Sequence, residues 1–408
     1  MNILFIHGNF PGQFRHLAAS LGKDNKHKVI FLTAREDAKN EQMEGIEVRH
    51  FKLHRKPNVS THHYLITTEE AVLKGQAVLR AISALIEEGI RPRLVISHGG
   101  MGLGLFVKDL LPEAIHIGLF EWFFQPNTSC WLLRNFGLNE QLQSNMRNLP
   151  ILDELRSCDV GVVPTTWQKN QFPTEYQSKL EVIFDGIDTG FFKPDLDIDR
   201  HEVILRGEEL SEALTIQPNT PVLSYATRGM ETLRGFPTFL RTAAMALEEF
   251  KDLKVIVAGR DRRAYSYDAL THNGSWKESI LGELGDFPGK DRLYFCGLMP
   301  YNYYRILLQR SNLHCYFTRP YVTSWSLFEA AACGARLCVN RTEATDGVIY
   351  NNSSVQWVDL DKPDEISKTI LSIFSQQENI ERSSMKQNHA LTISLAKWQK
   401  LINSCLAK

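Results

Sequence analysis

The feature that most constrains the fold is an alternation of short apolar strands and amphipathic helices that occurs twice along the chain. In the first half, the segments with this pattern are residues 2–6, 10–22, 27–34, 68–89, 92–100, 114–122 and 158–166. In the second half they are residues 220–229, 236–250, 253–259, 291–299, 302–311, 313–318 and 335–340. Strands that alternate with crossover helices form parallel sheets. The sequence therefore predicts an α/β protein with two doubly wound, Rossmann-like domains that face each other across a cleft.

The domain boundary is expected in residues 184–221, where the β/α rhythm lapses into a polar, acidic stretch. A chain of 408 residues with 43% hydrophobic content can bury the cores of two domains. We predict an N-terminal domain over 1–190 and a C-terminal domain over 191–385. The remainder, 386–408, is predicted to be an amphipathic helix that packs back toward the N-terminal domain.

Composition excludes several functional classes. The formal net charge is -1, so no basic field favours nucleic acid as a partner. The seven cysteines are scattered without C-x-x-C pairs, which is typical of reduced core thiols. The N-terminus lacks the pattern of a signal peptide, and no run of eighteen apolar residues occurs. We expect a soluble, cytoplasmic protein.

Ligands of doubly wound domains bind at the carboxyl ends of the strands, so the loops that follow strands are the places to look. The first such loop, residues 7–14, has Gly8 and Gly12 for tight turns and Pro11 as a natural first helical residue. The free N–H groups of the helix that follows could bind an anion. The alternative is a glycine turn without a ligand, since the pattern is not G-x-G-x-x-G.

Two further loops follow strands. The second, residues 97–104, is rich in glycine and contains His98, which is either a structural histidine or a contact to the acceptor. The third, residues 225–236, carries Arg228 and Arg234 just before a helix. Guanidinium groups bind phosphate oxygens in pairs, and a helix N-terminus adds favourable N–H groups. This loop is therefore a candidate phosphate site, although two arginines six residues apart are also common on ordinary surfaces.

Glu329 is a lone carboxylate in a short, otherwise apolar predicted helix that ends at a glycine. One interpretation is a capping box, in which Ser326 caps the helix and Glu329 bonds back to it. The other is that the helix begins at Thr323 or Ser324. In that case Glu329 faces a polar cleft, where it could bind ribose hydroxyls.

These residues also match a family. The segment EAAACGARLCVNRTEATDGVI, residues 329–349, resembles the donor-site segment of family 4 glycosyltransferases of the GT-B fold. Other segments resemble one bacterial branch of that family: NILFIHGNFPGQFRHLA, GLFEWFF, PTTWQKNQFP, FDGIDT, RGFPTFL, PYNYYRILLQRS and VTSWSLFEA. The resemblance implies that a hexose is transferred from a nucleotide diphosphate donor, UDP- or GDP-linked, with retention of anomeric configuration. It also implies a pathway of polysaccharide biosynthesis.

The resemblance assigns roles on the donor side. Arg228 and Arg234 correspond to the Arg/Lys pair that binds phosphate, and Glu329 to the glutamate that binds ribose. Gly12 corresponds to the glycine whose backbone approaches the donor. Ser324, Trp325 and Ser326 complete the expected donor site. Tyr321 stands where the family has a first glutamate, so sugar recognition differs here.

On the acceptor side, Glu121 lies about where many members of the family carry a catalytic-site histidine. It could accept a sugar hydroxyl, shield a developing positive charge or activate the acceptor. The remaining acceptor-side candidates are His62, His98, Gly99 and Gly100. The acceptor is expected to be a hydroxyl compound, and a peripheral membrane contact is expected if that compound is lipid-linked.

The implied chemistry requires no cofactor and no metal, because arginines and helix N-termini can meet the charge on the leaving diphosphate. The D-x-D pattern in DLDID, residues 195–199, lies in the interdomain stretch and is interpreted as a solvated acidic linker. Two alternatives stay open. One is a nucleotide-sugar-binding protein with decayed catalysis, and the other is a sugar-nucleotide epimerase of the same fold.

Overall fold

The computed structural model describes residues 1–24, 26–41, 43–132, 136–265, 274–349, 354–376 and 389–407. The chain divides into two compact units, which are described separately. The N-terminal unit comprises Met1–Ser129, Asn135–Gly186 and His389–Lys408, and the C-terminal unit comprises Cys130–Arg134 and Ile187–Asn388. The main chain passes from the N-terminal to the C-terminal unit after Gly186 and returns at His389. The predicted boundaries were after 190 and after 385.

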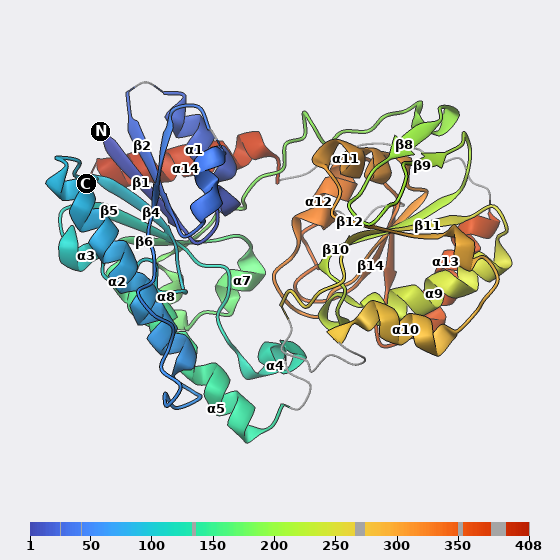
Figure 1. The fold of residues 1–408 in the computed structure, drawn as a ribbon, viewed down its shortest axis with the longest axis horizontal. Coiled ribbons are helices and arrows are strands. Elements are labelled where there is room, and N and C mark those ends of the chain that lie inside the picture. Colours follow the sequence, from blue (N-terminus) through green and yellow to red (C-terminus); the bar gives the residue numbers. More distant parts are fainter. Residues whose placement is uncertain are drawn as a thin grey trace. The chain divides into compact units, whose positions relative to one another are not determined.

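Within the described residues, the N-terminal unit contains a seven-stranded parallel sheet in the order β3-β2-β1-β4-β5-β6-β7 (Figure 1). Its strands are β1 Asn2–His7, β2 Lys28–Thr33, β3 Ile46–His50, β4 Leu94–His98, β5 Ile115–Leu119, β6 Val160–Val163 and β7 Leu180–Val182. Its helices are α1 Arg15–Gly22, α2 Ile66–Glu87, α3 Val107–Leu110, α4 Pro126–Ser129, α5 Leu138–Met146, α6 Asn148–Ser157, α7 Thr166–Asn170, α8 Thr174–Gln177 and α14 Leu391–Leu406.

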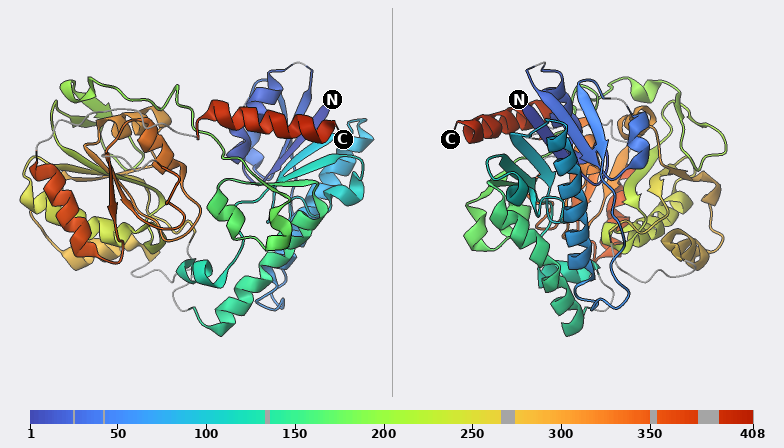
Figure 2. Two further views of the ribbon diagram at one scale, coloured as in Figure 1. Left: turned by 180° about the vertical axis from the view of Figure 1, so that it is seen from behind. Right: turned by 60° about the vertical axis from the view of Figure 1, so that its left-hand side comes forward.

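Both faces of this sheet are covered, as the continuous apolar sequence of β1 requires. Ile3 and Phe5 of β1 pack on one face with residues of α1 and α14. Leu4 and Ile6 pack on the opposite face with residues of α2 and α3. Helix α14 lies beside α1 (Figures 1 and 2), so the end of the chain belongs to the N-terminal core, with Trp398 and Ile402 buried there.

The C-terminal unit contains, among the described residues, a six-stranded parallel sheet in the order β12-β11-β10-β13-β14-β15. Its strands are β10 Val222–Gly229, β11 Lys254–Arg260, β12 Leu293–Gly297, β13 Leu313–Tyr316, β14 Leu337–Asn340 and β15 Val355–Val358. A separate antiparallel hairpin joins β8 Val203–Leu205 to β9 Leu214–Ile216. The helices are α9 Phe236–Glu249, α10 Trp276–Leu284, α11 Tyr301–Arg310, α12 Trp325–Ala332 and α13 Pro363–Ser375.

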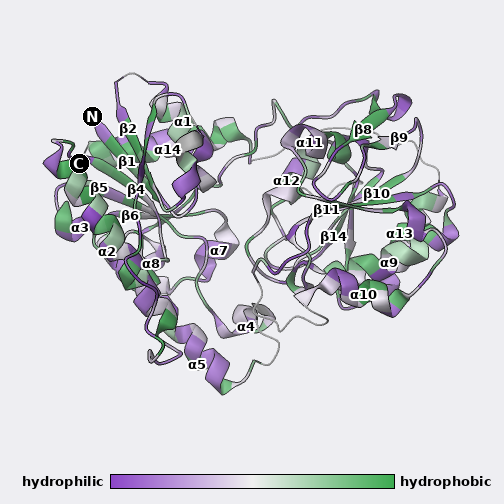
Figure 3. Cartoon of the chain, viewed as in Figure 1, coloured by the Kyte–Doolittle hydropathy of each residue, from purple (hydrophilic) through white to green (hydrophobic). Residues whose placement is uncertain are grey.

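The two faces of this second sheet are covered by different elements. Residues of α9, α10 and α13 pack on one face, and residues of α11 and of the β8–β9 hairpin pack on the other. Figure 3 shows the strands of both units as mainly hydrophobic, in keeping with their burial. The α/β architecture with two doubly wound parallel sheets is therefore confirmed.

The sequence pattern missed strands at the edges of the sheets and the structure of the interdomain stretch. Strands β3, β7 and β15 lie at sheet edges, where one neighbour is absent and the apolar run is correspondingly short. The polar stretch before Pro221 contains the β8–β9 hairpin. The interpretation of DLDID as a solvated linker was wrong for Asp199, because its carboxylate accepts a hydrogen bond of 2.8 Å from the buried Arg310 guanidinium.

The seven cysteines have free thiols, and five of them are buried. In the part of the chain that the structure describes, no helix is both long enough and apolar enough to cross a membrane.

Candidate functional site

In the N-terminal unit, the loops that follow β1, β4 and β5 meet at one edge of the sheet. These three strands are neighbours in the order β1-β4-β5, and all run parallel. Their carboxyl ends therefore place the loop containing Gly12, the residue His98 and the residue Glu121 next to one another. The structure brings together three residues that the sequence selected separately.

The Glu121 carboxylate receives hydrogen bonds from two side chains. Gln13 Nε2 lies 2.9 Å from Glu121 Oε1, and His98 Nε2 lies 3.0 Å from Glu121 Oε2. The main-chain oxygen of Glu121 accepts a bond of 2.7 Å from Gln168 Nε2. The Glu121 side chain nevertheless retains 23% of its exposure, whereas His98 retains 4%. Glu121 is therefore held firmly but can still reach a ligand.

Two neighbouring histidines have opposite charge preferences. Burial, with the nearby charge of His98, lowers the pKa of His7 to about 3. Burial also disfavours a charged His98, but the hydrogen bond and negative charge of Glu121 outweigh it and raise the pKa of His98. In the same way, the contact with His98 outweighs burial and lowers the pKa of Glu121. Both shifts favour a charged imidazolium beside a charged carboxylate.

Gly12 is required by its contact with His7. It has a φ of +53°, in the region that favours glycine, and an added Cβ would lie 2.6 Å from the His7 ring. The short 3-10 turn Gly12–Phe14 then leads into α1. Gly12 is therefore needed for close packing of the loop against His7, whether or not the loop binds a ligand.

Glu154 is a functional candidate that the sequence did not single out. This buried residue of α6 accepts hydrogen bonds from Gly100 N at 3.0 Å and Gly102 N at 2.5 Å, and so fixes the glycine loop after β4. Burial raises the pKa of Glu154 to about 7, although these N–H groups favour its ionised form. No motif marked it, because its partners are backbone groups more than fifty residues away. Gly99 also belongs to this loop and packs against the Phe120 ring.

His62 has different neighbouring residues from the other acceptor-side candidates. It precedes α2, and its ring stacks on His63 at 4.6 Å and meets Tyr64 edge-on at 4.8 Å. Tyr64 and His63 in turn contact Asn139 of α5. Among the described contacts, none joins His62 to His98, Gly99 or Gly100, so the structure does not gather these four candidates into one cluster.

In the C-terminal unit, Arg234 is buried at the end of the loop after β10. Its Nη1 donates to Thr318 Oγ1 at 2.7 Å, and its Nη2 donates to the Val322 carbonyl at 2.9 Å. Its guanidinium carbon lies 5.1 Å from the Tyr265 ring centroid and 5.6 Å from that of Tyr321. The planar guanidinium is therefore fixed between two aromatic rings and two hydrogen-bond acceptors.

Arg228 differs from Arg234 in that its side chain is exposed. Its guanidinium carbon lies 5.9 Å from the same Tyr265 ring. Tyr265 and Tyr321, whose ring centroids are 5.4 Å apart, therefore connect the two arginines. Tyr321, at the position of the family's first glutamate, thus lies next to the candidate phosphate site and brings an aromatic ring where a carboxylate was expected.

The structure decides between the two interpretations of Glu329. Ser324 is the N-cap of α12, since its Oγ accepts from Ser326 N, and Ser326 is already within the helix. The capping box built on Ser326 is therefore wrong. Glu329 is 6% exposed and forms a side-chain hydrogen bond with Tyr304 of α11. Burial and the negative charge of Glu329 together raise the pKa of Tyr304 well above its ordinary value.

The first turn of α12 lies at the same sheet edge as Arg234. Ser324 N donates to Tyr316 OH at 2.8 Å, and Arg234 Nη1 lies 3.5 Å from that same hydroxyl. Trp325 is partly exposed beside them. The N-terminus of α12 and the Arg234 guanidinium thus both contact the Tyr316 hydroxyl. Both groups favour an anionic ligand.

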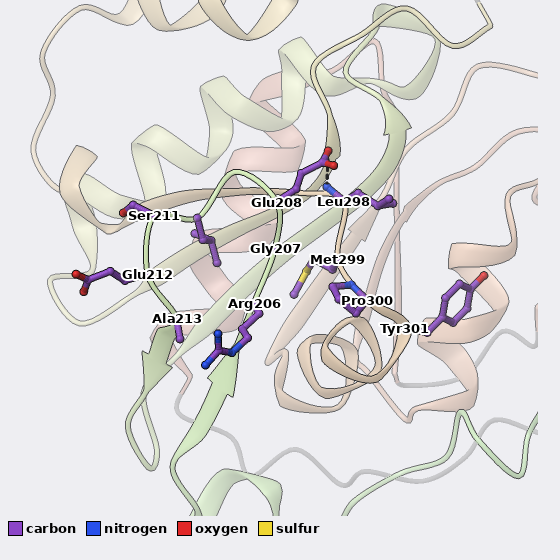
Figure 4. A pocket seen from close by; sticks show the side chains of 11 residues that line it. Arg206, Gly207, Glu208, Ser211, Glu212, Ala213, Leu298, Met299, Pro300 and Tyr301 are labelled. Atoms are coloured by element: carbon purple, nitrogen blue, oxygen red, sulfur yellow. Dashed lines mark hydrogen bonds between the residues drawn. The ribbon is translucent and has the colours of Figure 1, made fainter. Parts of the chain in front are cut away.

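A pocket of about 660 Å³ lies at the carboxyl end of β12 (Figure 4). It is lined by the hairpin segment 206–213, without Glu209, and by residues 298–301. Glu208 is fixed there by a bidentate bond to Arg260 and by Leu298 N at 3.0 Å. Tyr301 at its rim is 6.4 Å, ring to ring, from Tyr304, the partner of Glu329. The pocket was not anticipated, because the hairpin that lines it was not predicted.

Among the residues that the structure describes, no group of three or more His, Cys, Asp or Glu side chains is arranged to hold a metal ion.

Residues 25–192 match the model of the glycosyl transferase family 4 group. A search among curated proteins found no match. The chain is similar in structure to sucrose-phosphate synthase from Thermosynechococcus elongatus, with a TM-score of 0.72 and 13% identity over 100% of this chain and 99% of that one.

Two further examples among the similar solved structures also cover all of this chain. HepE from Anabaena, in complex with UDP and glucose, has a TM-score of 0.62 and 13% identity over 99% of its own length. A putative UDP-N-acetylglucosamine 2-epimerase from Listeria monocytogenes has a TM-score of 0.59 and 13% identity over 96% of its length. The chain therefore has the GT-B fold, and the match over residues 25–192 supports a transferase enzyme of the glycosyltransferase class.

Proposed function

We propose that this protein is a retaining glycosyltransferase that moves a hexose from a nucleotide diphosphate sugar to a hydroxyl acceptor. The observation that carries the proposal is the position of Glu329. Its carboxylate is buried and does not cap its helix. It bonds to Tyr304 of α11, and the first residue of that helix, Tyr301, lines a pocket at the carboxyl edge of a parallel sheet. Such a carboxylate is suited to bind the hydroxyls of a ribose.

The donor fits the C-terminal unit as follows. Glu329 binds the ribose, and the nucleobase occupies the pocket beside Tyr301. The diphosphate is bound by the exposed Arg228, by Arg234 and by the N-terminus of α12 at Ser324, Trp325 and Ser326. HepE, which has the same fold, was solved with UDP, so UDP is the first nucleotide to test.

In the reaction, the bond between the anomeric carbon and the diphosphate breaks while a bond to the acceptor oxygen forms on the same face of the sugar, and the proton of the acceptor hydroxyl passes to the departing diphosphate. Negative charge develops on the diphosphate, and fixed cations and N–H groups that are already in place stabilise it without reorganisation. No metal is required for this step. If the acceptor is lipid-linked, the protein binds a membrane surface peripherally.

Two other functions use the same donor site. The likeness to a putative epimerase favours an epimerase as the second candidate. An epimerase isomerises its nucleotide sugar and needs no acceptor. The tyrosine at position 321, in place of the expected glutamate, favours a nucleotide-sugar-binding protein without catalysis.

One experiment separates the three. Purified protein is incubated with UDP-glucose, UDP-galactose, UDP-N-acetylglucosamine and GDP-mannose, with and without hydroxyl acceptors. Release of nucleoside diphosphate with a glycosylated product supports the transferase, and an isomerised donor supports the epimerase. A raised melting temperature without turnover supports a binding protein.

The matched variants are Arg228→Ala and Arg241→Ala. Arg228 is exposed and Arg241 is partly exposed, but Arg241 of α9 pairs with Glu283 of α10. Only Arg228→Ala is expected to weaken nucleotide binding.

A further inference from the structure

A series of directed hydrogen bonds ends at the Glu121 carboxylate. An ionised carboxylate only accepts hydrogen bonds, so Gln13 directs its Nε2 toward Glu121 Oε1, at 2.9 Å. Its Oε1 then faces His7 Nε2 at 2.7 Å and accepts a hydrogen bond from that nitrogen. The other ring nitrogen of His7, Nδ1, lies 2.8 Å from Asn9 N and 3.0 Å from the Asn9 carbonyl oxygen. His7 and the Gln13 amide thus hold each other in place beside Glu121.

The second carboxylate oxygen is bound from another strand. His98 Nε2, at the end of β4, lies 3.0 Å from Glu121 Oε2. Each oxygen of Glu121 therefore accepts one N–H donor, and each keeps a further lone pair. Because the side chain is 23% exposed, those lone pairs can accept a hydroxyl from a ligand. An ionised carboxylate with one lone pair open on each oxygen is a suitable acceptor for a sugar hydroxyl.

We propose that Gln13 and His98 are positioning residues that hold Glu121 as an ionised carboxylate, which binds a hydroxyl of the sugar substrate and does not remove a proton. The proposal rests on the proposed function, and it selects one of the three roles that the sequence left open for Glu121. N–H donors on both oxygens stabilise the ionised form and so weaken the carboxylate as a base. The ligand class is a polyhydroxylated pyranose.

The charges around the pair agree with this assignment. Glu121 faces His98 and His7, and its pKa lies below the ordinary value. His98 faces Glu121, with Glu154 and Asp185 as further negative charges, and its pKa lies above the ordinary value. A general base for turnover near neutral pH would instead need a raised pKa.

Nuclear magnetic resonance of the histidine rings tests the ion pair without any substrate. The His98 signal is assigned as the one missing in His98→Gln, and it is followed between pH 5 and 9. The pKa of His98 should be higher in the wild type than in Glu121→Gln, because the variant lacks the charged partner. Equal pKa values of His98 in the two proteins would overturn the proposal.

Kinetics test the positioning role. Gln13→Met keeps the size of the side chain and removes its N–H donor. Gln177→Met is the matched control, since among the described residues the Gln177 amide donates to the Phe172 carbonyl. For Gln13→Met, kcat/KM for the nucleotide sugar should fall about tenfold or more, with unchanged affinity for the nucleoside diphosphate. The acidic limb of its pH profile should move to higher pH, because Glu121 has lost a hydrogen bond to its ionised form.

His98→Gln should keep more activity than His98→Phe, because the amide can still donate to Glu121. An unmoved acidic limb in Gln13→Met, or a turnover that follows deprotonation of a group near pH 7 and loses that dependence in Glu121→Gln, would overturn the assignment. A wild-type protein that turns over no nucleotide sugar would refute the proposed function and the sugar ligand with it, while the His98 signal would still decide whether Glu121 is ionised and paired.

Discussion

Replacing Glu329 with glutamine separates a ligand-binding role of this residue from a structural one. The residue is buried and bonded to the Tyr304 hydroxyl, and Ser324 caps the helix. In Glu329→Gln, the Oε1 atom can still accept from Tyr304, but the bond is no longer assisted by charge. A hydrogen bond to a charged group contributes about 1.5–3 kcal/mol and a neutral one about 0.5–1.5 kcal/mol. The loss of about 1 kcal/mol is offset in part, because no charge is buried in the variant.

The expected effect on stability is therefore small, and the effect on the ligand is larger. A change of about 1 kcal/mol in the free energy of unfolding moves the melting temperature of units of this size by roughly 2–4 °C. A ribose donates two hydroxyls, and glutamine offers one acceptor oxygen together with a misplaced N–H donor. We expect binding of UDP to weaken at least about tenfold, which is about 1.4 kcal/mol.

The assay is calorimetric titration of the wild type and the variant with UDP and with 2'-deoxy-UDP, alongside thermal denaturation. The variant should lose much more affinity for UDP than for the deoxy compound. Tyr304→Phe is the control, since it leaves the carboxylate intact and removes only the structural bond. Equal losses for the two nucleotides, or no loss for either, would refute a ribose role and leave Glu329 as the structural partner of Tyr304.

Three further predictions concern Arg234, Glu154 and Gly12. Arg234→Ala should lose about 2–4 kcal/mol of transition-state stabilisation, measured as a fall in kcat/KM, and its melting temperature should also fall. The Arg241→Ala control should change neither quantity, and turnover of Arg234→Ala within twofold of wild type would contradict this role. For Glu154, the pKa is raised by burial to about 7, so its contribution to stability should be complete below about pH 4.5 and lost as pH rises through about 7. Urea denaturation from pH 4.5 to 8 should show this decline in the wild type and its absence in Glu154→Gln, and an equal decline in both would disprove it. Gly12→Ala should lower the free energy of unfolding by about 1–3 kcal/mol, because the new Cβ meets the His7 ring at a positive φ; an unchanged urea midpoint would show that the loop relaxes freely.

The pattern of residues along the chain predicts the α/β architecture and selects the loops in which to look for a site. Strands buried on both faces need continuous apolar runs, and crossover helices need an apolar stripe, so both patterns are local and legible along the chain. For the same reason the loops after β1, β4 and β10 could be selected from the residue pattern alone. Edge strands such as β3 and the β8–β9 hairpin lack such a pattern, because fewer of their side chains are buried.

The tertiary structure alone decided the partners of the charged groups. Gln13 and Glu121 are 108 residues apart in the chain, and His98 and Glu121 are 23 residues apart, yet their atoms lie within 3.0 Å. Tyr304 beside Glu329 and the backbone amides around Glu154 are likewise contacts between separate elements. A hydrogen bond depends on distances and directions of a few ångströms, which are set by how parallel strands align at the sheet edge. That alignment is a property of the packed core as a whole, and no local spacing of residues records it.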